Sequence, residues 1–222
     1  MSRYDCRDVE ERAEGLKMAV AAVARGELVV TPTDTVYGIG ADAFEPAAVT
    51  RLLQAKGRGR DMPPPVLVAR ADVLPALTSE LADGVVALTE RFWPGGLTVV
   101  CWAQPSLSWD LGDTGGTVAV RVPDHPVAQM LLDATGPLAV SSANVTGQPA
   151  ATTAAMAQDQ LGTAVEVYLE DGPIGEHPSE DGPALPSSIV DATGEVPRLV
   201  RAGAIPLAVL REVLPELVDG TG

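Results

Sequence analysis

The feature that most constrains the fold of this chain is the alternation of short apolar runs with segments whose apolar residues recur at helical spacing. Helical spacing, together with the proline that can open the second segment, predicts helices at 16–23, 46–56, 81–92, 127–134 and 210–217. Short apolar runs predict strands at 28–31, 66–68, 97–102, 118–122, 138–141, 165–169, 188–190 and 198–200. This alternation is typical of an α/β fold.

The predicted elements favour one α/β domain with a mixed, mostly open sheet covered by helices. The chain has 222 residues, of which 46% are hydrophobic, so it can bury a large aliphatic core. The Gly- and Pro-rich stretch Asp171–Pro186 interrupts the pattern. We interpret it as a surface loop, which serves either as a lid or as a passive connection.

Charge and composition exclude several kinds of partner and site. A formal net charge of -15 argues against tight binding to a nucleic-acid backbone or an anionic membrane. No stretch reaches the roughly 18 apolar residues that a membrane helix needs, and no apolar run follows the first residues, so we expect a cytoplasmic protein. With only two cysteines, neither a disulfide framework nor a Cys/His metal site is indicated.

Basic residues are concentrated in one short segment of this acidic chain. Arg51, Lys56, Arg58 and Arg60 fall within ten residues, where an even distribution would place fewer than one. Lys56 is also one of only two lysines among fifteen basic residues. An ammonium and a guanidinium are not interchangeable at a phosphate, so the segment is a candidate anion site; chance placement is the alternative.

Four polar, Gly-rich clusters lie next to predicted strands, at 31–40, 56–62, 114–121 and 141–147. In open α/β sheets, ligands bind at strand ends, where backbone N–H groups and short hydroxyl side chains face a common crevice. Neutral donors from Thr, Ser and Asn, combined with the charges of Lys56, Arg58 and Arg121, suit phosphates and carboxylates.

The sequence does not support the more specific motifs of dinucleotide-binding folds, phosphate loops or serine hydrolases. The G-x-G-x-x-A pattern at 38–43 is followed at once by a proline-initiated segment, which disfavours a dinucleotide fold. The chain has no G-x-x-x-x-G-K-[ST] phosphate loop and no G-x-S-x-G elbow for a serine nucleophile. His125-Pro126 is better interpreted as the start of the following helix.

Six motifs in order make the chain resemble the YrdC-like family. They are T-P-T-D-T-V-Y-G-I-G at 31–40, K-G-R at 56–58, F-W-P-G-G-L-T at 92–98, V-A-V-R-V-P at 118–123, S-S-A-N-V-T-G at 141–147 and P-S-S-I-V-D at 186–191. The resemblance covers about residues 15–203. It implies one domain over 1–222, built on a twisted, open mixed sheet with a concave ligand-binding surface and a C-terminal helix at about 206–217. Longer members carry a further C-terminal domain, for which we expect no room here.

The resemblance implies an activity. Family members include threonylcarbamoyl-AMP synthases, which condense L-threonine, bicarbonate and ATP into threonylcarbamoyl-adenylate and release pyrophosphate. A tRNA threonylcarbamoyl transferase complex then passes the threonylcarbamoyl group to an adenosine of certain tRNAs. Mg²⁺ is expected through the ATP phosphates, and direct tRNA binding is expected to be weak at most.

The resemblance also assigns roles to residues. Lys56, Arg58, Ser142 and Asn144 would hold the triphosphate and act in catalysis. Further contacts to the nucleotide would come from Thr117 and Arg201. The threonine contacts would come from Thr35, Arg121, Val140 and Ser188, with Arg121 clamping the carboxylate.

The chain departs from the family pattern at Met62, Ala69 and Ala150, so we expect the individual contacts at these positions to differ from those of other family members. Thr35, Thr117 and Ser188 would instead serve only to satisfy turn backbones if they have no ligand role. Two other functions stay open: a non-catalytic RNA-binding module on the same surface, and a carbamoyl-adenylate enzyme with another acceptor.

Overall fold

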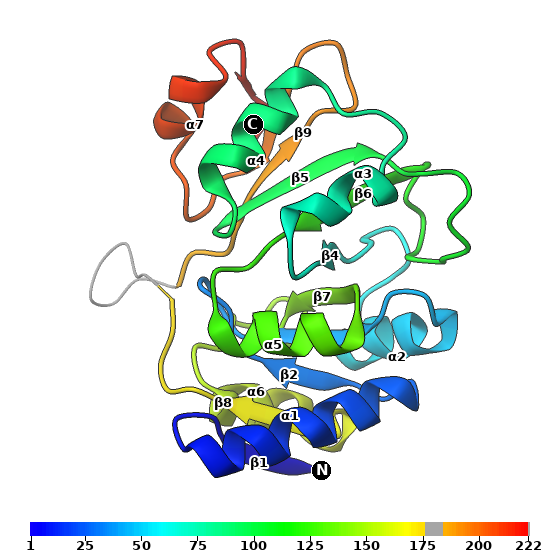
Figure 1. Ribbon diagram of the computed structural model, residues 1–222, viewed down its shortest axis with the longest axis vertical. Coiled ribbons are helices and arrows are strands. Elements are labelled where there is room, and N and C mark those ends of the chain that lie inside the picture. The colour runs from blue at the N-terminus through cyan, green and yellow to red at the C-terminus, as the bar shows by residue number, and fades with distance from the viewer. Residues whose placement is uncertain (176–183, 222) are drawn as a thin grey trace.

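The computed structural model describes residues 1–175 and 184–221, and a mixed sheet of 11 strands runs along its longest axis (Figure 1). The strand order is β1-β8-β2-β3-β7-β4-β6-β5-β9-β10-β11. Parallel and antiparallel pairs alternate irregularly, as in the antiparallel β3·β7 pair and the parallel β4·β6 pair. The strands are β1 Ser2–Asp5, β2 Val29–Thr31, β3 Gly38–Asp42, β4 Val66–Leu67, β5 Leu97–Trp102, β6 Thr117–Arg121, β7 Leu138–Ser142, β8 Val167–Glu170, β9 Ser188–Asp191, β10 Arg198–Arg201 and β11 Val218–Asp219.

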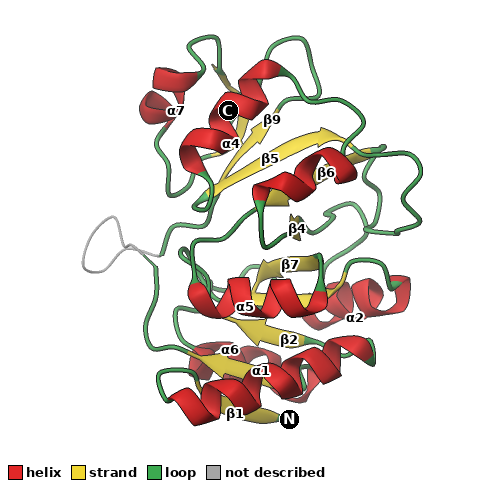
Figure 2. Ribbon diagram, in the orientation of Figure 1, coloured by secondary structure: helices red, strands yellow, loops and turns green. Residues whose placement is uncertain are grey.

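Helices cover both faces of this sheet (Figure 2). The α-helices are α1 Val9–Ala24, α2 Pro46–Lys56, α3 Leu74–Leu77, α4 Asp83–Phe92, α5 Pro126–Thr135, α6 Ala154–Leu161 and α7 Leu207–Val213, with short 3₁₀ helices at Ala71–Val73 and Gly162–Ala164. Helices α1 and α5 share one apolar cluster with β2 and β7, whereas α2, α4 and α6 belong to a second cluster. None of the helices in the described ranges combines the length and hydropathy that a membrane span requires.

Helix α2 is positioned by local chemistry at both of its ends. The Glu45 carboxylate accepts from the N–H of Ala47, and Pro46 occupies the first turn, where a missing N–H costs nothing. Gly57 ends the helix with φ of 60°, a left-handed conformation that favours glycine. This sharp ending places Lys56 and Arg58 on either side of the turn. The helix start predicted at Pro46 is confirmed.

Helix α5 begins as the sequence indicated. The Nδ1 atom of His125 accepts from the N–H of Val127 at 3.3 Å, and Pro126 is the first helical residue. His125 therefore caps the helix, which confirms the structural interpretation of His125-Pro126.

The predicted C-terminal helix at about 206–217 is too long. Helix α7 ends at Val213, and Leu214 has φ of -127° and ψ of 79°. Pro215 follows, and a proline disfavours the α conformation in the residue before it. The chain then forms β11 beside β10.

The predicted surface loop Asp171–Pro186 is described only in part. Its residues 176–183 lie outside the described residues, so its role as a lid stays a prediction.

Candidate active site

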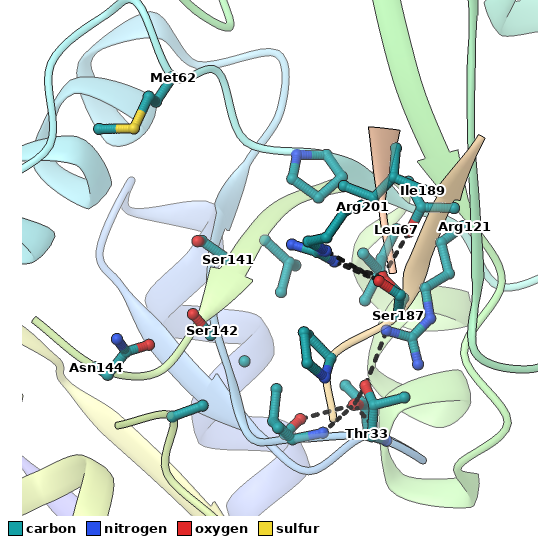
Figure 3. A pocket seen from close by; sticks show the side chains of 18 of the residues that line it. Thr33, Met62, Leu67, Arg121, Ser141, Ser142, Asn144, Ser187, Ile189 and Arg201 are labelled. Carbon is teal, nitrogen blue, oxygen red and sulfur yellow. Dashed lines mark hydrogen bonds between the residues drawn. The ribbon is translucent and has the colours of Figure 1, made fainter. Parts of the chain in front are cut away.

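A cavity of about 650 Å³ lies over the middle of the sheet, and the wall-forming residues come from distant parts of the chain (Figure 3). Strands β4, β5, β6, β7, β9 and β10 all contribute, together with the 33–36 loop and the segment after α2. Figure 3 shows Ser141, Ser142 and Asn144 on one wall and Arg121 and Ser187 on the facing wall. The lining contains seven of the ten predicted site residues, namely Thr35, Arg58, Arg121, Val140, Ser142, Asn144 and Arg201.

Lys56 lies beneath the wall rather than in the lining. Its side chain is fully buried, and its Nζ donates to the backbone carbonyls of Ser142 and Asn144, the latter at 2.7 Å. Burial, followed by the charge of Arg58, lowers the pKa of Lys56 to about 7. Lys56 therefore has a structural role, because it fixes the backbone of the Ser142–Asn144 turn. Its predicted contact with the triphosphate stays a prediction.

Arg58 lines the cavity and carries N–H groups that could donate hydrogen bonds to a ligand. One Nη1–H donates to the Ser141 hydroxyl at 3.2 Å, while the buried Nε has no hydrogen-bond partner among the described residues. Burial lowers the pKa of Arg58, and Asp61 opposes that shift. A buried donor without a partner costs about 1–3 kcal/mol, so a ligand that accepts from Arg58 would recover this energy.

Arg121 is held by three protein groups. Its Nε donates to the Gly95 carbonyl at 2.9 Å, Nη1 to the Thr35 hydroxyl at 3.0 Å, and Nη2 to Oδ1 of Asp34 at 2.6 Å. The residue is only 6% exposed, and burial lowers its pKa while Asp34 opposes the shift. The arrangement fixes the guanidinium plane, and two of its five N–H groups have no protein partner among the described residues.

Arg201 reaches the cavity from β10. Its Nη2 donates to the carbonyl and the hydroxyl of Ser187 at 2.7 and 2.9 Å, and the Ser187 hydroxyl lies 2.8 Å from that of Thr98. Burial of the guanidinium, with the charges of Arg121 and Arg58, lowers the pKa of Arg201 to about 10. A bound anion would relieve this repulsion on Arg201, so the cavity is a candidate anion site.

Two other predicted residues lie outside the lining. The Thr117 hydroxyl donates to the Thr114 carbonyl at 2.8 Å, at the opposite end of β6 from Arg121. The fully buried Ser188 hydroxyl donates to the Ile205 carbonyl at 2.7 Å and accepts from the Ile205 N–H at 3.0 Å. Both hydroxyls satisfy backbone groups here, and their ligand contacts stay predictions.

The basic cluster is less concentrated in space than in sequence. Arg51 donates to the Gly26 carbonyl, and Arg60 pairs with Asp110 on the surface. Only Arg58 of the four basic residues lines the cavity. Sequence reasoning also missed the lining residues Thr33, Thr98 and Ser187, and it missed Asp34 behind Arg121. The signal for Asp34 was available, since it is the only carboxylate in the T-P-T-D-T motif.

The three departures from the family pattern occupy different places. Met62 and Ala150 line the cavity, and Met62 is 41% exposed. Ala69 instead packs against the cluster beneath α1 and α5. The first two positions can therefore alter ligand contacts directly.

Asn144 is constrained more than the sequence indicated. Its Nδ2 donates to the carbonyls of Val145 and Gln148 at 3.0 and 2.8 Å. Both amide hydrogens are used within the protein, so only Oδ1 is available, and it lies 3.5 Å from the Lys56 ammonium.

The family model Sua5_yciO_yrdC, described as "Telomere recombination", matches residues 21–203. This chain belongs to the Sua5/YciO/YrdC family. The match confirms the family resemblance of the six sequence motifs, and its range includes every lining residue of the cavity.

Relatives in the Sua5/YciO/YrdC family carry names that concern one reaction. A Mycobacterium leprae protein named "Putative threonylcarbamoyl-AMP synthase" is 52% identical over 211 residues, which cover 95% of this chain and 93% of the relative. A Pyrococcus abyssi protein named "Threonylcarbamoyl-AMP synthase" is 35% identical, with 95% of this chain and 61% of the relative covered.

Solved structures of the Sua5/YciO/YrdC family share the fold. The structure titled P. abyssi Sua5 complexed with L-threonine has a TM-score of 0.89 at 31% identity over 99% of this chain. This chain spans 62% of that archaeal chain. Escherichia coli YciO has a TM-score of 0.78 at 21% identity over 94% of this chain, which supports the fold alone. The predicted open, mixed α/β fold is confirmed.

Proposed function

We propose that this chain synthesises L-threonylcarbamoyl-AMP from L-threonine, bicarbonate and ATP and releases pyrophosphate. The observation that carries the proposal is the convergence of Arg58, Arg121 and Arg201 on one cavity in a protein with a net charge of -15. The names of its family relatives concern this reaction. The volume of about 650 Å³ lies within the range of small-molecule sites.

The wall with Arg58 and Ser142 suits the triphosphate, together with Arg201, which reaches into the cavity from the facing side. Arg58 supplies a buried donor without a protein partner among the described residues, and Arg201 supplies a second charge near the first. Charge-assisted hydrogen bonds from guanidinium groups to phosphate are short and strong. Lys56 supports this wall from below by fixing the carbonyls of Ser142 and Asn144.

The wall with Arg121 and Thr35 suits the amino acid. Arg121 is oriented by three bonds and keeps two N–H groups, which match the two oxygens of one carboxylate. Threonine held there would present its amine to bicarbonate, and the two would form a carbamate with loss of water. A carbamate oxygen would then attack the α-phosphorus while pyrophosphate leaves. Holding both reactants in one cavity supplies proximity, and the guanidinium groups stabilise the developing charge.

We propose Mg²⁺ as the ion that accompanies ATP. The described residues contain no group of three or more His, Cys, Asp or Glu side chains that could hold a metal. The cavity offers the hydroxyls of Thr33, Thr98, Ser141 and Ser142, which are neutral oxygen donors. The ion would therefore be held mainly by the phosphates, as is common for Mg²⁺. It would neutralise phosphate charge during the transfer.

The proposal places the product in a larger process. The adenylate would pass to a tRNA threonylcarbamoyl transferase complex in the cytoplasm, and contact of this chain with tRNA would be weak at most because of its acidic composition. The same composition, with the names of the relatives, disfavours a non-catalytic RNA-binding module.

An omission experiment tests the proposal. Pyrophosphate release from ATP by the full chain is measured with threonine and bicarbonate together, with each alone, and with carbamoyl phosphate in place of threonine. We expect release only when threonine and bicarbonate are both present, and its loss in Arg58→Ala. Pyrophosphate release that does not depend on threonine, or that requires carbamoyl phosphate, would contradict the proposed reaction.

A further inference from the structure

The segment 58–62 follows α2 and brings Arg58 and Met62 to the cavity. The N–H of Arg58 donates to the Leu53 carbonyl at 2.9 Å, so the start of the segment is fixed by the end of the helix. Three prolines follow at 63–65, and proline has no N–H to donate. The path of the chain between Arg58 and these prolines therefore depends on contacts with other segments.

The loop between β5 and β6 supplies those contacts at Arg60. The Arg60 guanidinium donates from Nη2 to Oδ1 of Asp110 at 2.7 Å and from Nη1 to Oδ2 at 3.1 Å, which is a two-point pairing. Its Nε donates to Oδ1 of Asp113 at 3.4 Å, and the Asp113 N–H donates to the Arg60 carbonyl at 2.8 Å. Among the described residues, these are the only hydrogen bonds that join residues 59–62 to another segment.

The 109–113 loop is itself anchored to the core. Leu111 is 3% exposed and belongs to the larger apolar cluster. Trp109 stacks on Phe44 with ring centroids 5.5 Å apart. Asp110 lies between these two anchored residues, so Arg60 pairs with a carboxylate whose backbone is held in place. Less conformational entropy is lost in such a pair than in one between two mobile surface side chains.

A close approach of two backbones accompanies the pairing. Gly112 has φ of 110°, which favours glycine, and a Cβ added to it would lie 2.7 Å from the Arg60 carbonyl oxygen. The 58–62 segment therefore packs directly against the loop, and any larger residue at Gly112 would displace it.

We propose that Arg60 is a positioning residue that, through Asp110, holds Arg58 at the cavity. The inference rests on the proposed function, in which Arg58 contacts the triphosphate of ATP. One residue separates the two arginines, so a shift of the Arg60 backbone moves the Arg58 guanidinium away from the Ser141 hydroxyl, which lies 3.2 Å from its Nη1. Hydrogen bonds weaken steeply when donor and acceptor are misaligned. Arg60 thus affects the binding of ATP without contacting it.

The experiment measures the affinity of the full chain for ATP by calorimetry, without threonine and bicarbonate so that no turnover occurs. Arg60→Gln and Asp110→Asn each disrupt the two-point pairing, but they change the net charge in opposite directions. Overall charge predicts opposite effects on ATP affinity, whereas positioning predicts a loss in both. We expect each single variant to bind ATP about three- to fivefold more weakly than the unaltered chain, and the double variant to be no weaker than either. Tighter or unchanged binding of ATP by Asp110→Asn would overturn the proposal.

Arg25→Gln is the matched control. Arg25 and Arg60 are both 51% exposed, both pair with a carboxylate, and both substitutions remove one positive charge. We expect Arg25→Gln to change ATP affinity by less than about 1.5-fold, because Arg25 lies outside the segment that carries Arg58. Threonine affinity should stay unchanged in all of these variants. An equal loss of ATP and threonine affinity in Arg60→Gln would indicate general destabilisation and would also overturn the proposal.

A pair of glycine variants tests the same contact without changing any charge. Gly112→Ala places a Cβ against the Arg60 carbonyl, whereas Gly115→Ala places one where no atom lies within 4 Å. Both glycines have positive φ, at 110° and 62°, so both variants carry backbone strain. We expect only Gly112→Ala to weaken ATP binding, by at least about threefold. Equal ATP affinity of the two variants would contradict the positioning role.

Pyrophosphate release separates this inference from the proposed function. If the unaltered chain binds ATP but releases no pyrophosphate with threonine and bicarbonate, the proposed function fails, and the ATP affinities still decide the role of Arg60. If the unaltered chain binds no ATP at all, both proposals are overturned.

Discussion

The ammonium nitrogen of Lys56 lies 2.7 Å from the backbone carbonyl oxygen of Asn144, 88 positions later in the chain. It also donates to the Ser142 carbonyl, so one buried side chain joins the end of α2 to the turn after β7. The K-G-R motif at 56–58 and the S-S-A-N-V-T-G motif at 141–147 are therefore joined by a structural contact within the protein.

Replacement of Lys56 should destabilise the fold. In Lys56→Met the Ser142 and Asn144 carbonyls lose a buried donor, and we expect the free energy of unfolding to fall by about 2 kcal/mol. Lys17→Met is the matched control, because the only other lysine is 75% exposed and forms a surface pair. Its change should stay below about 0.5 kcal/mol. Urea denaturation measures both values, and equal stability of the two variants would contradict the structural role.

The stability supplied by Lys56 should depend on pH. Its pKa is about 7 in the folded protein against 10.5 ordinarily, so between these values the unfolded chain binds the extra proton. Stability rises with pH wherever the unfolded state binds more protons. The unaltered chain should therefore gain stability relative to Lys56→Met from pH 7 upward until about 10.5. Urea denaturation at a series of pH values tests this, and a parallel pH profile in the two proteins would argue against a depressed pKa.

The two walls should respond differently to the same substitution. Arg58→Lys should raise the KM for ATP, and Arg121→Lys should raise the KM for threonine, each on the order of tenfold, because an ammonium cannot reproduce a planar, forked donor. Each variant is the control of the other in steady-state kinetics with both substrates varied. Identical changes in both KM values for the two variants would refute the division of labour.

Neighbouring serines offer a further contrast. Ser188→Ala removes two hydrogen bonds to the Ile205 backbone from a fully buried position, so we expect about 2 kcal/mol lower stability. Ser187→Ala removes one acceptor of Arg201, whose bond to the Ser187 carbonyl remains, so stability should change little while the KM for ATP rises a few-fold. Thermal unfolding and kinetics on both variants check this. A large effect of Ser188→Ala on threonine KM alone would favour the ligand contact that the family resemblance implies.

Much of the fold was predictable because its elements carry local signals. Strand β5 at 97–102 and helix α2 have the predicted bounds. An apolar run marks the strand, while Pro46 at the start and Gly57 at the end mark the helix. Strand β3 and helix α6 were missed. Strand β3 reads Gly-Ile-Gly-Ala-Asp, and its Gly38 lies so close to Val140 that an added Cβ would contact it at 2.6 Å. Sequence spacing cannot reveal such close packing between strands.

The chemical character of the cavity was predictable from the sequence, but the side-chain contacts around it were not. Clusters of Thr, Ser, Asn and Arg at strand ends indicated an anion site, and most of these residues line one cavity. Contacts between distant segments decide the rest. They bury Lys56, pair Asp34 with Arg121, and pair Arg60 with Asp110 on the surface instead of in the cavity. Local patterns hold no information about which charge meets which partner.

The most direct test is identification of the product. The full chain is incubated with ATP, L-threonine and isotopically labelled bicarbonate, and the mixture is separated and analysed by mass spectrometry. The account predicts threonylcarbamoyl-AMP that carries the bicarbonate label, formed only with threonine and absent in Arg58→Ala. An unlabelled adenylate, or no adenylate above that of Arg58→Ala, would contradict it.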